Sequence, residues 1–146
     1  KKEDGLINDK ERLQMAEIVF KKFDNVRVSD IEFKMSKPNF TIDTLKEFKK
    51  RHKYNKLILL IGEDNLVGFN KWKDYEKIIE IAEVYVYPRD TNQKIPDEIL
   101  TNRNIKLVDA PKIKISSSHI RELIKSNKKI DDLVPKEVLG FFKFIT

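Results

Sequence analysis

A run of three serines followed by an arginine is the part of this sequence best suited to chemistry. Ser116, Ser117 and Ser118 precede an apolar helical pattern, and Arg121 lies three residues after Ser118. The first turn of a helix exposes unpaired backbone N–H groups, and this spacing places hydroxyls and the guanidinium on one helical face. Such a turn can bind a phosphate. The same serines can instead cap a helix that binds nothing, with Arg121 as a surface charge.

A second polar group follows the most apolar stretch of the chain. Residues 57–61 are all leucine or isoleucine, a pattern typical of a strand that is covered on both faces of a parallel sheet. Gly62, Glu63 and Asp64 come directly after it. Ligands of open α/β sheets lie at the carboxyl ends of the strands, so this end is a candidate binding edge.

The composition limits the classes of protein to consider. The chain of 146 residues suffices for one domain with its own core, and no apolar run approaches the about 20 residues of a transmembrane helix. The charged amino terminus also lacks the apolar part of a secretion signal. With no cysteine and two histidines, disulfides and a structural metal are not expected. We therefore expect residues 1–146 to form a single soluble, cytoplasmic domain.

The charge balance favours anionic ligands. Lys and Arg number 30 against 24 Asp and Glu, which gives a net charge of +6 and suits nucleotides or nucleic acid. The lysines are scattered among acidic residues and form no basic block, so a lysine-rich surface explains them equally well. We expect neither a membrane nor a nucleic-acid partner, and the choice between a monomer and a homo-oligomer stays open.

Hydrophobic periodicity predicts strands that alternate with helices, and hence an α/β domain with a mainly parallel sheet flanked by helices. Asn8 with Glu11 forms a predicted capping box, and Thr41 is a predicted helix cap. The predicted helices cover residues 8–23, 41–50, 75–82, 97–100, a segment from 118 and a last one from 135, and the predicted strands cover 26–33, with a bend at 29–30, 57–61, 84–87 and 105–108.

Seven short motifs fall in one order along nearly the whole chain. They are Arg12-x-x-Met15, Val28-Ser29-Asp30-x-Glu32, Phe40-Thr41-Ile42-Asp43-Thr44-Leu45, Ile61-Gly62-Glu63-Asp64, Lys71-Trp72, Pro88-Arg89 and Ile115-Ser116-Ser117-Ser118-x-Ile120-Arg121. This set resembles the bacterial nicotinate-nucleotide adenylyltransferases, which join ATP and nicotinate mononucleotide to give deamido-NAD and pyrophosphate in NAD biosynthesis. The resemblance implies a Rossmann-like nucleotidyltransferase fold and this adenylyl-transfer activity.

The resemblance also implies an ATP site. Ser117, Ser118 and Arg121 match the residues that hold the ATP phosphates, and Ser117 and Arg121 are the expected catalytic residues. Mg²⁺ is expected with ATP, where it screens the triphosphate. Gly62 and Asp64 match residues beside the bound nucleotides, where a glycine lets the backbone approach a ligand closely.

The substrate-binding residues implied by the resemblance are Trp72, Phe40, Thr41 and Thr44. Trp72 would stack on the pyridine ring of nicotinate mononucleotide, since an indole face attracts an electron-poor ring. Thr41, Thr44 and nearby backbone N–H groups would meet the nicotinate carboxylate at a helix start. Phe40 stands where tyrosine is common. The alternatives are that Trp72 only packs against the core and that Thr41 only caps its own helix.

The sequence departs from the family most at its beginning. Family members open with a strand, a glycine-rich turn and an H-x-G-H motif, and neither His52 nor His119 reproduces that pair. We therefore expect the carboxy-terminal three quarters of the family fold, lacking its first strand, with further residues preceding Lys1 in the natural protein. Adenylyl transfer depends on positioning and charge stabilisation, so we expect the 146 residues alone to be inactive.

Three alternatives stay open. One is a related nucleotidyltransferase that acts on another phosphate-bearing substrate, such as nicotinamide mononucleotide or phosphopantetheine. Another is a non-catalytic nucleotide- or RNA-binding module, if the natural protein lacks the histidine motif. The third is a structural or interaction domain that binds no nucleotide.

Overall fold

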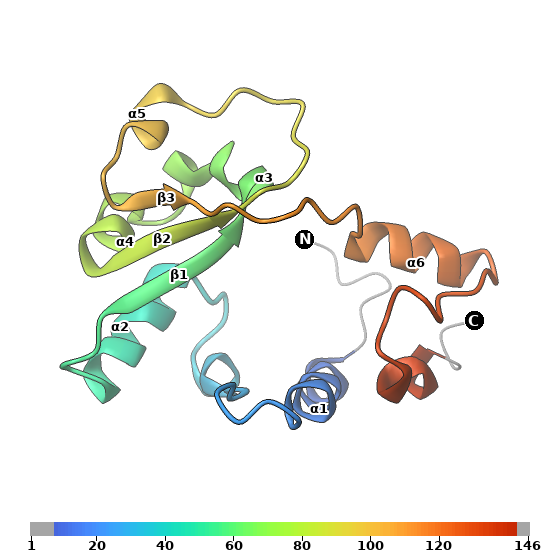
Figure 1. The fold of residues 1–146 in the computed structure, drawn as a ribbon. Coiled ribbons are helices and arrows are strands. Elements are labelled where there is room, and N and C mark those ends of the chain that lie inside the picture. The colour runs from blue at the N-terminus through green and yellow to red at the C-terminus, as the bar shows by residue number, and fades with distance from the viewer. Residues whose placement is uncertain (1–7, 143–146) are drawn as a thin grey trace. The chain divides into compact units, whose positions relative to one another are not determined.

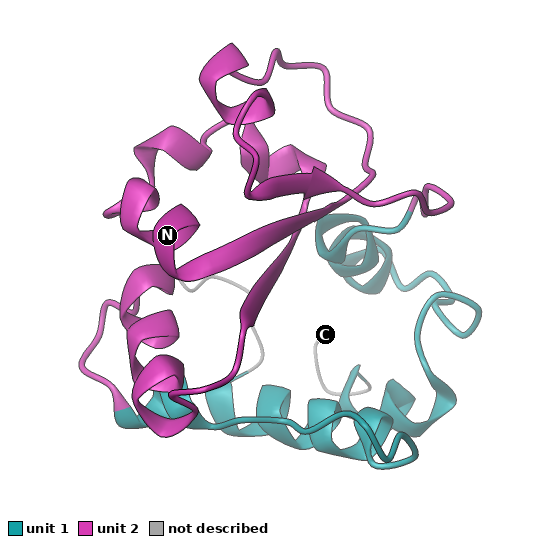
Figure 2. Ribbon diagram, turned by 60° about the vertical axis from the view of Figure 1, so that its left-hand side comes forward, with its two compact units in different colours: residues 1–34, 115–146 teal, residues 35–114 magenta. Residues whose placement is uncertain are grey.

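The computed structural model describes residues 8–142, which form two compact units (Figure 1). Unit 1 comprises Lys1–Lys34 and Ile115–Thr146, and unit 2 comprises Met35–Lys114 (Figure 2). Unit 1 is thus built from both ends of the sequence, whereas unit 2 is one continuous segment. Within residues 8–142, no helix is both long and apolar enough to cross a membrane.

Unit 2 is an α/β structure built on a parallel sheet, as predicted. The strands are β1 (Leu57–Gly62), β2 (Ala82–Tyr87) and β3 (Ile105–Leu107), in the spatial order β1-β2-β3. Both pairings are parallel, and the register places Gly62 opposite Tyr87. Because parallel strands end at the same edge of a sheet, the residues that follow β1 and β2 emerge close together.

Helices and turns of unit 2 pack on the sheet around one apolar core. They are α2 (Thr41–Arg51), α3 (Glu63–Leu66), the 3-10 helix η2 (Phe69–Lys71), α4 (Tyr75–Ile81) and α5 (Asp97–Leu100). The buried core joins all of them to β2 and consists of Ile42, Leu45, Leu66, Phe69, Ile78, Ile79, Ala82, Val84, Val86, Ile95 and Ile99. This core fixes the start of α2, the strand ends and the turn before α4, which carry the expected site residues.

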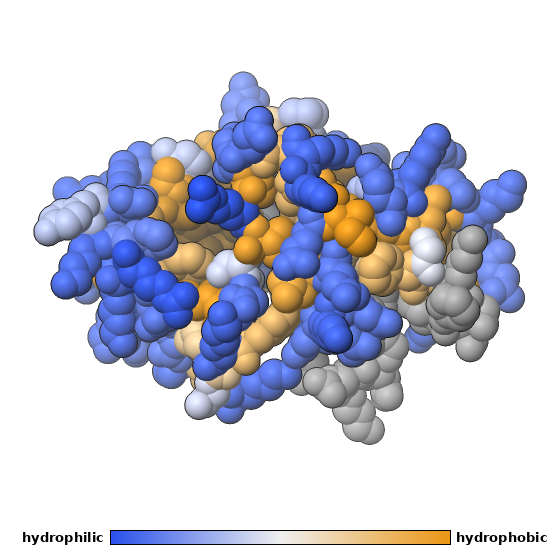
Figure 3. Space-filling model, turned by 90° about the horizontal axis from the view of Figure 1, so that it is seen from below, coloured by the Kyte–Doolittle hydropathy of each residue, from blue (hydrophilic) through white to orange (hydrophobic). Residues whose placement is uncertain are grey.

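The prediction that β1 is covered on both faces is wrong. Leu57, Leu59 and Ile61 pack against the core, but Ile58 and Leu60 are 51% and 64% exposed. Successive side chains of a strand point to opposite faces, so one apolar face of β1 lies open to solvent. Apolar surface between charged side chains is visible in Figure 3.

Unit 1 contains α1 (Asp9–Phe20), the 3-10 helix η1 (Ile31–Lys34), α6 (Ser117–Lys125) and the 3-10 helix η3 (Lys136–Phe142). Asn8 is confirmed as the cap of α1, because the backbone N–H of Glu11 donates to Asn8 Oδ1 at 2.9 Å. Glu11 Oε2 accepts from the side-chain Nδ2 of Asn8 at 2.8 Å, and not from the backbone as in a capping box. α1 packs against η3, and Lys22 Nζ lies 3.6 Å from Glu137 Oε1.

The strand predicted over residues 26–33 is wrong. The chain there is irregular until η1 begins at Ile31. The backbone N–H of Ile31 donates to Ser29 Oγ at 3.3 Å, and Lys34 Nζ lies 2.9 Å from Asp30 Oδ2. Such local side-chain bonds compete with the hydrogen bonds of a sheet. In addition, α1 ends at Phe20 and not at residue 23, and the last helix is a 3-10 helix that begins at Lys136.

Candidate functional site

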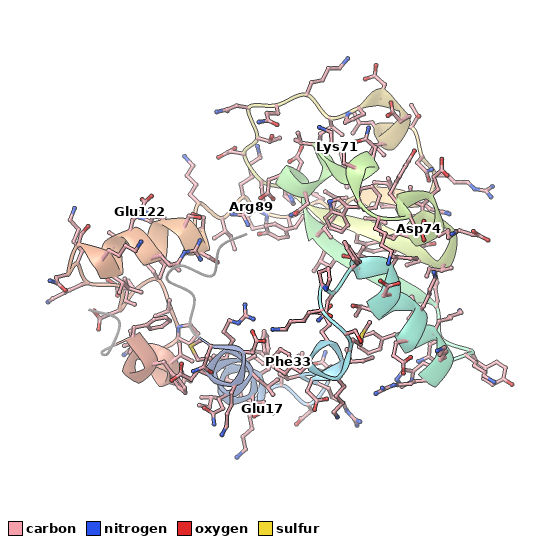
Figure 4. All side chains as sticks on the ribbon, turned by 180° about the vertical axis from the view of Figure 1, so that it is seen from behind. Glu17, Phe33, Lys71, Asp74, Arg89 and Glu122 are labelled. Atoms are coloured by element: carbon pink, nitrogen blue, oxygen red, sulfur yellow. The ribbon has the colours of Figure 1, made fainter. Side chains whose placement is uncertain are left out.

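Polar residues from the ends of two neighbouring strands meet at the carboxyl edge of the sheet in unit 2. Asp64 lies in α3 directly after β1. Arg89 follows β2 and is labelled in Figure 4. Arg89 Nε lies 3.7 Å from Asp64 Oδ1, and the backbone N–H of Arg89 donates to Glu63 Oε2 at 3.1 Å. Both side chains of the ion pair remain partly exposed, so they can also contact a ligand.

Arg89 was not among the predicted site residues, although its motif was noted. The signal that could have identified it is its position, two residues after the end of a strand that neighbours β1. Parallel pairing brings such a residue to the same edge as Asp64. The structure therefore adds a guanidinium to the predicted group of Gly62 and Asp64.

Gly62 is the point of closest packing at this edge. Its backbone has φ −78° and ψ 151°, which any residue can adopt. A Cβ at this position would lie 2.7 Å from Arg89 Cδ and would also overlap the Asp64 carboxylate. Gly62 therefore leaves space for the Asp64 and Arg89 side chains at the end of β1, and a larger residue would require both side chains to move.

An open cavity of about 530 Å³ lies beside Asp64 within unit 2. A hydrogen bond from Lys112 Nζ, 3.1 Å from Asp90 Oδ1, lowers the pKa of Asp90, which keeps that carboxylate ionised. The cavity thus offers charges of both signs together with hydroxyl and amide groups, which suits a polar ligand. Its lining residues are Asp64, Val67, Gly68, Lys71, Asp90, Thr91, Asn92 and Gln93, of which Lys71 is labelled in Figure 4.

The start of α2 carries Phe40, Thr41 and Thr44. The prediction that Thr41 caps this helix is wrong, because Phe40 has the extended backbone of the cap, with φ −115° and ψ 144°, and Thr41 is the first helical residue. Phe40 provides no side-chain cap. Thr44 Oγ1 lies 3.4 Å from the Phe40 carbonyl oxygen, to which it donates. The alternative in which Thr41 serves only as a cap is therefore excluded.

Trp72 follows η2 and is half-buried. Its indole packs against the core of unit 2, and its ring centroid lies 5.1 Å from that of Phe69 at an interplanar angle of 54°. Core packing thus covers part of the indole surface, as expected from the alternative in which Trp72 only packs against the core. The remaining surface of the ring stays accessible, so a stacking role is compatible with this position.

Neighbouring hydroxyls of the serine-rich turn in unit 1 have different hydrogen-bond partners. Ser116 is the N-cap of α6, and its Oγ accepts a hydrogen bond from the backbone N–H of His119 at 3.1 Å. Ser117 and Ser118 are the first helical residues. Arg121 Nη2 donates to Ser118 Oγ at 3.1 Å, so the predicted sharing of one helical face by these two residues is found. Ser116 therefore caps the helix, whereas the hydroxyl of Ser118 accepts from Arg121.

The grouping of the predicted site residues follows the two units. Unit 2 brings Gly62 and Asp64 together with Arg89, and it places Phe40 against Thr44. Unit 1 brings Ser118 and Arg121 together. Within the part of the chain that the structure describes, no three His, Asp or Glu side chains gather as a metal site.

Comparison with known proteins defines the class first. A family model described as cytidylyltransferase-like matches residues 1–123. The parallel sheet with polar residues at its carboxyl edge agrees with that class of nucleotidyltransferase. Several relatives carry the name "Probable nicotinate-nucleotide adenylyltransferase". The relative from Flavobacterium johnsoniae is 38% identical over 94% of this chain and 72% of its own length. The one from Christiangramia forsetii is 41% identical over 94% of this chain and 71% of its own length. The chain belongs to the nicotinate-nucleotide adenylyltransferase family, as the motifs indicated.

Solved structures support the fold. A nicotinic acid mononucleotide adenylyltransferase from Plasmodium falciparum, complexed with NaAD, has a TM-score of 0.72 at 20% identity and covers 97% of this chain and 76% of its own. The same protein complexed with APC has a TM-score of 0.70 at 21% identity, covering 93% and 75%. The predicted Rossmann-like nucleotidyltransferase fold is thereby confirmed.

Proposed function

We propose that this protein transfers the adenylyl group of ATP to nicotinate mononucleotide, which gives deamido-NAD and pyrophosphate in NAD biosynthesis. The observation that carries this proposal is the 41% identity with a relative of that name over 94% of the chain. The polar edge of unit 2 and the serine turn of unit 1 supply the kinds of side chain that the reaction needs. The chain spans about 72% of the length of the relative from Flavobacterium johnsoniae, and we propose that residues 1–146 belong to one nucleotidyltransferase domain that acts in the cytoplasm.

In the proposed reaction, a phosphate oxygen of nicotinate mononucleotide attacks the α-phosphorus of ATP in line with the leaving pyrophosphate. One P–O bond forms as the other breaks, and no covalent protein intermediate is needed. Ser117, Ser118 and Arg121 hold the ATP phosphates, and Arg121 and Ser117 stabilise the charge that develops on pyrophosphate. The 3.1 Å hydrogen bond between Arg121 and Ser118 supports this role, because it orients the guanidinium along the serine face. Mg²⁺ bound to ATP would screen the triphosphate charge.

The pyridine half of the substrate is assigned to unit 2. Trp72 stacks on the pyridine ring with the part of its indole that the core leaves accessible. Thr41, Thr44 and the backbone at the start of α2 bind the nicotinate carboxylate. Support comes from the positive end of the α2 dipole, because Phe40 provides no side-chain cap at this helix start. Gly62 and Asp64 lie beside the bound nucleotides, next to the polar cavity.

Two variants of the natural full-length protein test this proposal, one at a residue assigned to nicotinate mononucleotide and one at a residue assigned to ATP. Trp72→Ala should raise the KM for nicotinate mononucleotide about tenfold or more, with little change for ATP, because stacking is lost. Arg121→Ala should raise the KM for ATP instead. Arg103→Ala, on an exposed turn of unit 2, is the matched arginine control and should change neither. Equal losses for both substrates in either variant would contradict the assignments.

The choice of acceptor needs its own measurement. Pyrophosphate release should be followed with nicotinate mononucleotide, nicotinamide mononucleotide and phosphopantetheine at equal concentrations. Nicotinate mononucleotide should give the highest kcat/KM, because its carboxylate matches the helix start at Thr41. A preference for either of the other acceptors would replace the proposed substrate.

A further inference from the structure

Lys73 joins the two parts of unit 2 that carry the expected pyridine-binding residues. It directly follows Trp72, and its side chain reaches the first turn of α2, at positions separated by 30 residues in the sequence. Lys73 Nζ lies 2.8 Å from Asp43 Oδ2 and 4.5 Å from the centroid of the Phe40 ring. The ammonium therefore contacts an anion and an aromatic face at once.

The α2 side of this contact is held independently of Lys73. Asp43 lies in the first turn of α2, where the helix dipole favours a carboxylate. Its side chain is 34% exposed and that of Lys73 is 45% exposed, so the pair is partly shielded from water. Ion pairing and the cation–π contact act on the same ammonium, which restricts its position more than either contact would alone.

The Trp72 side of the contact is also constrained. The backbone N–H of Trp72 donates to the Phe69 carbonyl at 3.0 Å, and the backbone N–H of Tyr75 donates to the Trp72 carbonyl at 3.2 Å. Asp74 has φ 51° and ψ 41°, a left-handed conformation that closes the turn before α4. Lys73 thus extends from a tight turn, and its side chain connects that turn to α2.

We propose that Lys73 is a positioning residue that fixes the start of α2 relative to Trp72 and so preorganises the binding site for an acidic pyridine mononucleotide. This inference rests on the proposed function, because Trp72 and the α2 start are assigned there to the same substrate. The core holds both elements without this contact, but the Lys73 side chain is a direct link between them, and loss of that link would let the indole of Trp72 shift against the α2 start, which lowers affinity. ATP affinity depends on other residues and stays unchanged.

A ligand-free measurement tests the positioning step first. Trp72 is the single tryptophan of the sequence, so intrinsic tryptophan fluorescence reports on this turn alone. Lys73→Met should increase acrylamide quenching of Trp72 about twofold, because an exposed ion pair and a cation–π contact are lost together. In Lys73→Arg, acrylamide should quench Trp72 fluorescence as it does in the wild type, since a guanidinium also pairs with a carboxylate and stacks on a ring. Lys46→Met, an exposed substitution on α2, is the matched control and should have no effect.

Steady-state kinetics of the natural full-length protein then test the effect on the substrate. Lys73→Met and Asp43→Asn should each raise the KM for nicotinate mononucleotide about three- to tenfold, with the KM for ATP changed less than about twofold. The reversed pair, Asp43→Lys with Lys73→Asp, should recover part of this loss. Circular dichroism checks that each variant is folded, and Asp43→Asn provides a milder variant should Lys73→Met fail to fold.

The outcomes separate this inference from the proposed function. Unchanged acrylamide quenching in both Lys73→Met and Asp43→Asn would overturn the positioning role. Equal changes in the KM for both substrates would overturn the preorganisation of the pyridine site. A wild-type protein that does not bind nicotinate mononucleotide would overturn the proposed function and the substrate named here, whereas the acrylamide comparison would still decide whether Lys73 positions Trp72.

Discussion

The backbone N–H of Arg89 donates to Glu63 Oε2 at 3.1 Å, so the segment that follows β2 is fastened to the residue that follows β1. Glu63 can accept this bond because it directly follows the last residue of β1. An alanine side chain cannot accept this bond. Glu63 therefore gives this chain an added contact next to the Arg89 to Asp64 ion pair.

Replacement of Glu63 tests the strength of this contact. Glu63→Ala should lower the free energy of unfolding by about 1 kcal/mol, the usual contribution of one hydrogen bond. Glu63→Gln keeps an acceptor oxygen and should lie close to the wild type. Urea denaturation of both variants makes the measurement. A Gln variant as unstable as the Ala variant would show that the charge matters and that the acceptor alone does not suffice.

An added methyl group at Gly62 should disturb both neighbouring side chains. Its Cβ would lie 2.7 Å from Arg89 Cδ, so Gly62→Ala should displace Arg89 and Asp64. We expect ATP affinity to fall about tenfold, since a misplaced pair of charges removes about 1.4 kcal/mol of binding free energy. Gly140→Ala is the control, because a Cβ there meets no atom within 4 Å. Calorimetric titration with a non-hydrolysable ATP analogue would measure the change, and equal affinity in the two variants would contradict it.

Helix capping and ligand binding should depend on different serines of the serine-rich turn. Ser116→Ala removes the hydroxyl that caps α6 and should destabilise the protein by about 1 kcal/mol. Ser117→Ala should leave thermal stability nearly unchanged and weaken ATP binding. Thermal unfolding with and without ATP distinguishes the two effects. If Ser116→Ala alone weakened ATP binding, the phosphate role assigned to Ser117 would be wrong.

The stability of the sheet should depend on pH through Glu83. Hydrogen bonds from Lys56 and Lys106, with Nζ to carboxylate distances of 2.6 and 3.0 Å, lower the pKa of Glu83 below its ordinary value of 4.5. A group with a lowered folded-state pKa stabilises the protein above its unfolded pKa, and this contribution is lost as pH falls through the folded value. The free energy of unfolding should therefore decline less steeply below pH 4.5 in Glu83→Gln than in the wild type. Parallel slopes from urea denaturation at several pH values would contradict this.

Helices and strands were predicted correctly where their own residues carry a clear hydrophobic pattern. The apolar run at 57–61 forms β1, and the helix predicted over residues 41–50 is α2, whose buried residues are Ile42 and Leu45. The strand predicted over residues 26–33 is wrong, because a strand also needs a neighbour with which to pair, and hydrogen bonds from local polar side chains form there instead.

Site residues were predictable where a motif marks them and less so where the fold brings them together. The link between Arg89 and Asp64 depends on the parallel register of β1 and β2, which no local pattern contains. The cap of α2 was misassigned by one residue, since backbone angles rather than side-chain type decide which residue precedes the helix. The roles of the predicted site residues in binding and catalysis stay predictions for the experiments above.

The packing of α1 against η3 has a consequence for synthesis of the protein. A ribosome releases α1 before η3, and all of unit 2 lies between them in the sequence, so unit 1 cannot close until unit 2 has been translated. Unit 2 is one continuous segment and can assemble its sheet while translation proceeds. The apolar residues of α1 must therefore remain soluble in the meantime, a period in which chaperones that hold nascent chains would find them accessible.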